Sequence, residues 1–156
     1  MFKKTILILL IAAWMALMFL FSSQPSVQSA QVSGGITNKV VDIIYSVSKT
    51  NLDRNKIDHI VRKTAHYSLY FVGGALLILL FNEYKIKLYQ KILYSEMIGM
   101  LYAMTDEYHQ TFVPGRSGQI SDVMLDSLGI LTGIIVVYIA IIYKKKFSLS
   151  QKSKSV

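Results

Sequence analysis

The 156-residue sequence contains no cysteine and comparatively few charged residues. Without cysteine the chain has no disulfides, thiolate metal sites, iron–sulfur clusters or cysteine nucleophiles. Charged residues make up 17% of it, whereas a soluble domain averages roughly a quarter. Apolar residues make up 53%, and the mean hydropathy is +0.42. This composition is typical of an integral membrane protein of single-domain length.

The chain also lacks internal repeats and any basic stripe interleaved with aromatic residues. Its formal net charge is +8, from 17 Lys and Arg against 9 Asp and Glu. Many of these cations lie in short clusters beside long apolar runs, as juxtamembrane residues do, and not on a polar helix that would bind nucleic acid. We therefore expect membrane lipids, and no nucleic acid, as partners.

Four long apolar runs predict an all-α fold, an integral membrane four-helix bundle. The runs cover residues 5–21, 64–81, 88–105 and 123–143. Each approaches the roughly 17 to 25 residues that a helix needs to cross the hydrocarbon core, where a helix satisfies its own backbone groups. The runs show no period-2 alternation, which argues against a barrel. The third run carries Glu96, so a helical hairpin that enters half of the membrane is an alternative there.

The first run has features of both a retained helix and a cleaved signal peptide. Lys3 and Lys4 precede it, and small residues follow it near residues 27–29, as in signal peptides. The run is longer than a typical signal-peptide core of about 7 to 15 residues, and Trp14 lies in its middle. We therefore expect this helix to be retained.

Clusters of lysine predict that both termini are cytoplasmic. The clusters at 3–4, 85–91 and 144–146 fall on one side if the four runs alternate in direction, and an excess of Lys and Arg marks the cytoplasmic side. The long connection on the other side contains an amphipathic helix around residues 36–47, which either shields the bundle or covers a site. The basic segment 144–156 is predicted to be a disordered cytoplasmic tail after a transmembrane domain of residues 1–143.

Ionisable residues gather at the outer ends of three of the runs. Such residues are costly inside a membrane and therefore indicate a functional site. On the second run they recur four residues apart, which places them along one helix face. The candidate acids and bases are His66, Asp106, Glu107 and Asp122, and the candidate ligand-binding residues are Arg62, Lys63, Tyr70, Gln110, Arg116 and Asp126.

The connection between the third and fourth runs predicts a tight turn that presents Arg116. Pro114 and Gly115 precede this arginine and are typical turn residues. Arginine offers a rigid fork for phosphate or carboxylate. On the fourth run, Gly129 and Gly133 lie four residues apart and would allow another helix to approach closely.

Four motifs together resemble the VanZ-like family of membrane proteins. They are Phe21-Ser22-Ser23-Gln24, Arg62-Lys63-x-x-His66-x-x-x-Tyr70, Asp106-Glu107-x-x-Gln110-x-Phe112-x-Pro114-Gly115-Arg116 and Asp122-x-x-x-Asp126-x-x-Gly129-x-x-x-Gly133. The resemblance extends over the whole chain except the basic tail. It implies a bacterial plasma-membrane protein, and the family is named for a member that lowers susceptibility to the glycopeptide teicoplanin. The resemblance implies no particular biochemical mechanism.

These residues favour a pocket for the anionic headgroup of an envelope lipid or of a lipid-linked cell-wall precursor. The arginines would bind phosphate or carboxylate. If the protein is an enzyme, which the sequence leaves open, His66 or Glu107 would act as the base. We expect no cofactor and no bound metal, because no His-Glu-x-x-His pattern is present and nearby arginines oppose a cation.

Two other classes of function remain open. A proton-coupled transporter or channel would use His66, Asp106 and Glu107 as a relay, although the chain has no inverted repeat and a homo-oligomer would have to supply one. A structural or accessory subunit would use the same charges as a salt-bridge network that holds the helices together.

Overall fold

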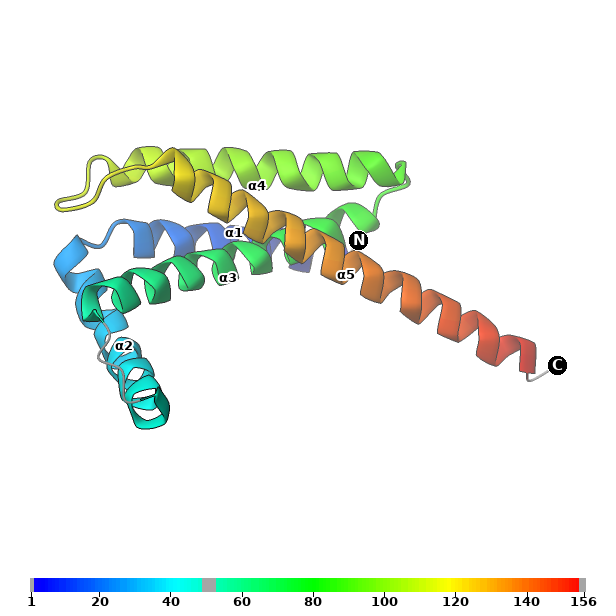
Figure 1. Cartoon of the computed structure of the whole chain (residues 1–156). Coiled ribbons are helices and arrows are strands. Elements are labelled where there is room, and N and C mark those ends of the chain that lie inside the picture. The colour runs from blue at the N-terminus through cyan, green and yellow to red at the C-terminus, as the bar shows by residue number, and fades with distance from the viewer. Residues whose placement is uncertain (1, 49–52, 155–156) are drawn as a thin grey trace.

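Every element of regular secondary structure in the described residues is an α-helix. In this computed structural model, residues 2–48 and 53–154 form five α-helices and no strand, which confirms the all-α prediction. The helices are α1 (Phe2–Ser22), α2 (Ser26–Ser48), α3 (Arg54–Asn82), α4 (Leu88–Gln110) and α5 (Ile120–Lys154). Helices α1, α3, α4 and α5 pack together as a helical body, whereas α2 projects away from it (Figure 1).

Three helices in the described residues are long and apolar enough to cross a membrane. They are Phe2–Ser22, Arg54–Asn82 and the Ile120–Ser148 part of α5. Helix α4 coincides with the predicted third run, but Gln90, Lys91 and Glu96 leave it less apolar than these three. It packs against α1, α3 and α5 along one side.

Helix α3 begins well before the predicted span at Thr64. Asp53 is its N-cap, and the carboxylate of Asp53 accepts a hydrogen bond of 3.0 Å from the backbone N–H of Asn55. Such a cap satisfies one of the free N–H groups of the first turn and stabilises the start of a helix. The added turns place Asp58 and Arg62 on the same continuous helix as His66.

Helix α2 is longer than the amphipathic segment predicted around residues 36–47. It packs chiefly against α3, where the hydroxyls of Ser33 and Thr37 donate to Oδ1 of Asp58 at 2.7 and 2.9 Å. Several of its apolar side chains, such as Val32 and Ile43, remain exposed. The apolar face of α2 is therefore largely uncovered by the rest of the described chain.

The C-terminal segment is helical through Lys154, whereas the sequence predicted a disordered tail over residues 144–156. Helix α5 continues through Lys154 and does not end near residue 143. Once a helix has formed, each further residue adds a hydrogen bond, and the Lys/Ser segment contains no proline or glycine to end it. Residues 155 and 156 of the predicted tail lie outside the described residues.

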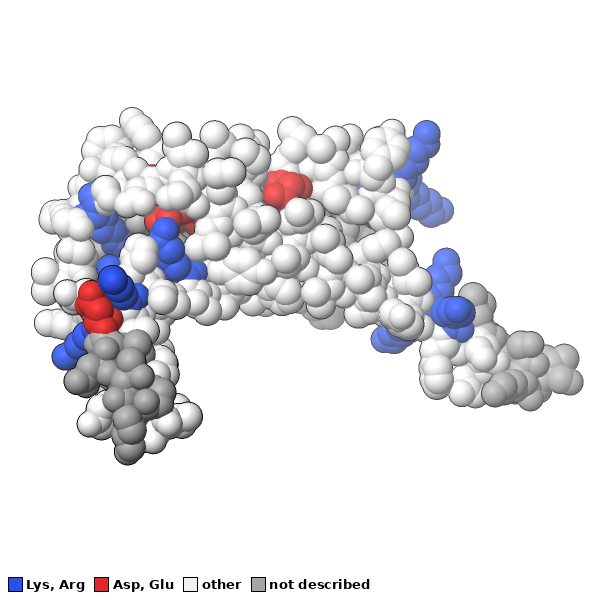
Figure 2. All heavy atoms as spheres, in the orientation of Figure 1, with Lys and Arg blue, Asp and Glu red and all other residues white. Residues whose placement is uncertain are grey.

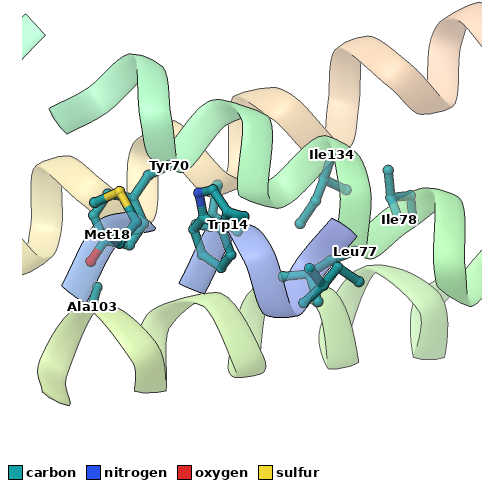
Figure 3. Packing of buried hydrophobic residues seen from close by; sticks show 9 residues of the cluster. Trp14, Met18, Tyr70, Leu77, Ile78, Ala103 and Ile134 are labelled. Atoms are coloured by element: carbon teal, nitrogen blue, oxygen red, sulfur yellow. The ribbon is translucent and has the colours of Figure 1, made fainter. Parts of the chain in front are cut away.

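An aromatic and aliphatic core joins the four helices of the helical body. Figure 3 shows Trp14, Tyr70, Leu77 and Ile134 pointing into this interior. The Trp14 indole N–H donates to the Leu69 carbonyl at 2.9 Å. The Trp14 and Tyr70 rings pack edge to face, with 5.8 Å between their centroids. Aromatic pairs of this kind contribute about 0.5 to 1.5 kcal/mol beyond the burial of their area.

Glycines bring α3 and α5 into backbone contact. A Cβ added at Gly129 would lie 2.6 Å from the Tyr67 carbonyl oxygen, and one at Gly133 would overlap the Phe71 carbonyl. Gly74 on α3 faces the Ile130 backbone of α5 in the same way. The predicted close approach of another helix is therefore confirmed, and that helix is α3. This contact sets the relative positions of the ionisable residues on both helices.

Candidate functional site

A pocket of about 360 Å³ lies where α2, the start of α3, the α4–α5 connection and the start of α5 meet. We call this the site end of the helical body, and Figure 2 shows acidic and basic side chains gathered there. All predicted site residues except Asp106 and Tyr70 line the pocket. They are Arg62, Lys63, His66, Glu107, Gln110, Arg116, Asp122 and Asp126.

Arg116 uses its guanidinium to tie two connections together. Its Nε donates to the Gln24 carbonyl at 3.0 Å, its Nη2 to the Phe21 carbonyl at 3.3 Å, and its Nη1 to the Gln110 side-chain oxygen at 3.2 Å. Gly115 precedes it with a φ of +75°, a conformation that glycine adopts readily, so the predicted turn is confirmed. These three acceptors are neutral, so Arg116 forms no direct ion pair within the described residues, although the carboxylates of Asp106 and Glu107 lie near enough to attract its charge.

Burial lowers the pKa of Arg116 from its usual value, and the neighbouring Arg62 lowers it further. An arginine nevertheless keeps its proton in proteins. Arg116 therefore contributes a fixed positive charge to the site end.

Gln110 connects Arg116 to two carboxylates. Its side-chain nitrogen donates to Asp106 Oδ2 at 3.3 Å and to Glu107 Oε1 at 3.2 Å. The other oxygen of Glu107 accepts from the backbone N–H of Gln119 at 2.9 Å. Glu107 is thus held by both oxygens, with its side chain at the pocket wall.

Two further contacts cross from α3 to α5. Lys63 Nζ and Asp122 Oδ1 form an ion pair at 2.6 Å. His66 Nδ1 lies 3.9 Å from Asp126 Oδ2, which is beyond hydrogen-bond distance. Asp126 is 1% exposed, and both its oxygens lack a hydrogen-bond partner among the described residues. Burying such a group without a partner is costly, so Asp126 marks a point where a proton or a ligand group would be accommodated.

The structure places Tyr70 and Asp106 away from the pocket. Tyr70 is fully buried in the core against Trp14. A step of eight residues turns a helix about 80° beyond two full turns, so Tyr70 faces a different direction from Arg62. Asp106 is buried where it accepts from Gln110. Both side chains lie behind residues that line the pocket and do not line it themselves.

Sequence reasoning gave no role to several residues that shape the site. The carbonyls of Phe21 and Gln24 hold Arg116, and the backbone of Gln119 holds Glu107. The 21–24 motif was recognised, but backbone acceptors have no side-chain signature. Asp58 was also missed. Its Oδ2 lies 3.3 Å from Arg62 Nε, and its Oδ1 accepts from Ser33 of α2; its position four residues before Arg62 is the signal that would have found it.

His109 does not line the pocket, although the neighbouring Glu107 and Gln110 do. Its Nδ1 is 3.3 Å from the Ser22 hydroxyl, and its ring contacts Phe19 of α1 with 4.6 Å between ring centroids and a tilt of 42° between the ring planes. His109 therefore connects α4 to α1.

In the described part of the chain, no three His, Asp or Glu side chains lie close enough to share a metal ion.

Comparison with known proteins identifies one family. A sequence model of the VanZ/LLP1 family matches residues 7–142, which includes every residue that lines the pocket. No curated protein and no solved structure matches the chain.

Proposed function

This chain belongs to the VanZ/LLP1 family, and we propose that it is a plasma-membrane protein that binds an anionic envelope component at the site end. The ligand class is the phosphate-bearing headgroup of a lipid or of a lipid-linked cell-wall precursor. One observation carries this proposal: the pocket combines the cations Arg62, Lys63 and Arg116 with apolar side chains such as Leu69 and Ile36. An amphiphile presents both kinds of surface.

The proposal includes α4 as a fourth membrane span. Its exposed face carries large apolar side chains, such as Leu93, Met97 and Leu101, which suit contact with lipid. Its buried face carries Ser95, Gly99 and Ala103 at four-residue spacing. Small residues at this spacing are typical of helix contacts inside membranes.

Lysine clusters support an orientation with the site end outside. The α3–α4 connection and the end of the α5 span carry the clusters at 85–91 and 144–146. Because Lys and Arg accumulate on the cytoplasmic side, this end lies inside, with both termini. Helix α2 then lies at the outer surface, where its exposed Val32 and Ile43 contact the headgroup region.

The charges of the pocket favour a headgroup that carries phosphate together with hydroxyl or amino groups. Arg62 is more exposed than Lys63, and its contact with Asp58 involves Nε alone, so its terminal nitrogens can donate to a phosphate. Arg116 adds a positive charge that no direct ion pair occupies within the described residues. Glu107 and Asp122 line the same pocket and can accept hydrogen bonds from hydroxyl or amino groups.

The proposal is tested by binding of soluble amphiphiles to the purified protein in detergent. The probes are short-chain phosphatidylglycerol, geranyl diphosphate as a stand-in for a polyprenyl-linked precursor, and short-chain phosphatidylcholine as the zwitterionic comparison with no net charge. We expect the two anions to bind and phosphatidylcholine to bind at least about tenfold more weakly, because charge-assisted hydrogen bonds supply the difference. The stronger of the two anions distinguishes lipid from precursor.

Arg62→Gln is the informative variant, and Arg54→Gln is its matched control. Arg54 lies on the same helix, is exposed and does not line the pocket. We expect Arg62→Gln to weaken binding of the anions about tenfold and Arg54→Gln to leave it unchanged. Equal binding by both variants and the parent, or equal binding of the anionic and the zwitterionic probes, would refute the proposed ligand class.

Reduced teicoplanin susceptibility is the proposed cellular consequence. Cells that produce the parent protein should tolerate more teicoplanin than cells that produce Arg62→Gln at equal membrane abundance. A purely structural role predicts instead that site variants lower abundance. Equal susceptibility at equal abundance would remove the resistance part of the proposal and leave the binding part to the assay above.

A second candidate, a proton-coupled transporter or channel, is favoured by buried carboxylates. Oxygens of Glu96, Asp106 and Asp126 lack hydrogen-bond partners among the described residues. Proton pathways in membranes use such groups. Liposomes with a pH gradient test it: leakage above that of empty liposomes, lost in Glu96→Gln, supports transport, and leakage equal to empty liposomes excludes it.

A further inference from the structure

A second cavity of about 430 Å³ lies at the opposite end of the helical body, which we call the lysine end. It is enclosed by the last turn of α3, the α3–α4 connection, the start of α4 and the second half of α5. Its lining includes Asn82, Ile86, Lys91, Tyr138, Lys145 and Lys146.

The charged residues that line this cavity have one sign, and the nearby Glu83, which does not line it, is paired with Lys3. Three of its lining residues are lysines and none is acidic. Lys91 Nζ donates to the neutral Asn82 side-chain oxygen at 3.1 Å, so its charge is oriented but not compensated. Lys145 and Lys146 form no ion pair within residues 2–48 and 53–154. In the view of Figure 2, this end shows basic atoms with no acidic atoms among them.

Such an arrangement favours an anion. Cations that share one small space repel one another, and water screens this repulsion least at the half-buried Lys91, beside the apolar walls, and most at the exposed Lys145 and Lys146. Ile86, Leu88, Ile141 and Ile142 supply these walls. An anion placed between the lysines would convert repulsion into attraction.

The other lining groups indicate what kind of anion fits. The Asn82 amide nitrogen and the Tyr138 hydroxyl are hydrogen-bond donors without a partner in the described part of the chain. Tyr138 also packs its ring against the core cluster, which holds its position. A phosphate accepts several hydrogen bonds, and the isoleucines suit the carbons attached to it.

We propose that the lysine end is a binding site for the phosphate of an anionic lipid from the leaflet that surrounds this end. Lys91, Lys145 and Lys146 neutralise the phosphate, Asn82 and Tyr138 donate hydrogen bonds to it, and the isoleucines contact the first carbons of the lipid. This site is separate from the pocket at the site end and does not depend on the function proposed there.

Native mass spectrometry of the full-length protein, released from detergent with defined lipids, tests this site. The probe is phosphatidylglycerol, with phosphatidylcholine as the zwitterionic comparison, whose phosphate is neutralised by its own ammonium group. We expect Lys91→Gln/Lys145→Gln/Lys146→Gln, made in the Arg62→Gln background so that the pocket at the site end contributes little, to weaken retention of phosphatidylglycerol at least about tenfold, since three charge-assisted contacts to the phosphate are lost. The matched control, Lys85→Gln/Lys87→Gln/Lys144→Gln, removes the same charge from neighbouring residues outside the cavity lining and should change retention less than about twofold.

Equal loss in the two triple variants would show general charge attraction and overturn the site, as would retention unchanged in both. If the triple variant is not monodisperse, Tyr138→Phe replaces it: we expect about a threefold loss from one missing hydroxyl, and no loss would overturn the site. Inorganic phosphate separates the two sources of the anion. Protection against unfolding by phosphate that equals protection by phosphatidylglycerol would show a free-anion site and refute the lipid assignment.

Discussion

The two ends of the helical body arrange their charges in opposite ways. At the site end, acids and bases are mixed, and Lys63 pairs with Asp122 at 2.6 Å. At the lysine end, the cavity lining holds cations and no acid. A mixed network stabilises its own geometry and can recognise a ligand with several polar groups, whereas charges of one sign require a counter-ion from outside. The same helices thus support two different kinds of site.

The α3–α5 contact holds both ends, so disrupting it should have the largest effect. In Gly133→Leu the side chain would overlap the Phe71 carbonyl, and we expect a loss of more than about 3 kcal/mol, with both cavities lost. Gly34→Ala is the control, because a Cβ there meets nothing within 4 Å and alanine favours a helix by about 1 kcal/mol. Thermal unfolding in detergent measures both, and a Gly133→Leu protein as stable as the parent would contradict the packing.

Arg116 is the next most sensitive position, because it holds the site end together. Arg116→Ala removes hydrogen bonds to Phe21, Gln24 and Gln110, and we expect a loss of about 2 kcal/mol. Arg116→Lys keeps the charge but not the fork and should also destabilise the protein. Lipid retention at the lysine end should stay at the parent level in either variant. Full rescue of stability by lysine would show that charge alone matters.

Two aspartates at the site end should respond in opposite directions. Asp126→Asn replaces a buried carboxylate, which lacks a hydrogen-bond partner among the described residues and lies 3.9 Å from His66 Nδ1, with a neutral amide, and we expect a gain of about 1 kcal/mol in stability. Asp122→Asn breaks a half-exposed ion pair and should cost less than about 1 kcal/mol. It also releases Lys63, so anion binding should rise a few-fold. Destabilisation by Asp126→Asn would show that its charge is paired with His66.

The smallest expected effect is a pH dependence at the lysine end. A hydrogen bond and ion pair from Lys3 hold the pKa of Glu83 below its usual value of 4.5. Because the folded state lowers this pKa, the contact stabilises the protein above about pH 4.5 and is lost as the pH falls through the lowered pKa.

Glu83→Gln tests this contact in melting curves between neutral pH and pH 3. The parent should melt slightly above Glu83→Gln at neutral pH, and the difference should vanish at the acidic limit. The neighbouring Lys4 makes a separate contact, with its Nζ 4.0 Å from the centroid of the Tyr84 ring. This contact does not involve the Glu83 carboxylate. A difference that grows with acidity would contradict the direction of the pKa shift.

The sequence predicted the helices better than it predicted their limits. The apolar runs located α1, α4 and α5 because few charged residues interrupt them. The early start of α3 was missed, since it depends on the Asp53 cap and on polar turns that carry no apolar pattern. The helical continuation to Lys154 was missed because a charged composition resembles that of a disordered tail.

The sequence predicted which residues gather at the candidate site, but not which of them contact one another. Ionisable residues at run ends identified Arg62, His66 and Glu107 as neighbours in space, and the structure places all three at one pocket. The sequence did not reveal that Tyr70 turns into the core, or that Arg116 binds backbone carbonyls. The direction of Tyr70 depends on which face of α3 packs against the core. The partners of Arg116 lie in chain segments far apart in sequence.

By itself the sequence determined which segments are helical and apolar, because helix geometry and the cost of exposing backbone groups to lipid follow from composition along one stretch of chain. It also determined where glycine allows close approach. Only the tertiary structure decided which charges meet, since Lys63 and Asp122, or Arg116 and Gln24, lie on different helices and connections. Hydrogen bonds and ion pairs act over a few ångströms, so their partners are set by the packing of the helices.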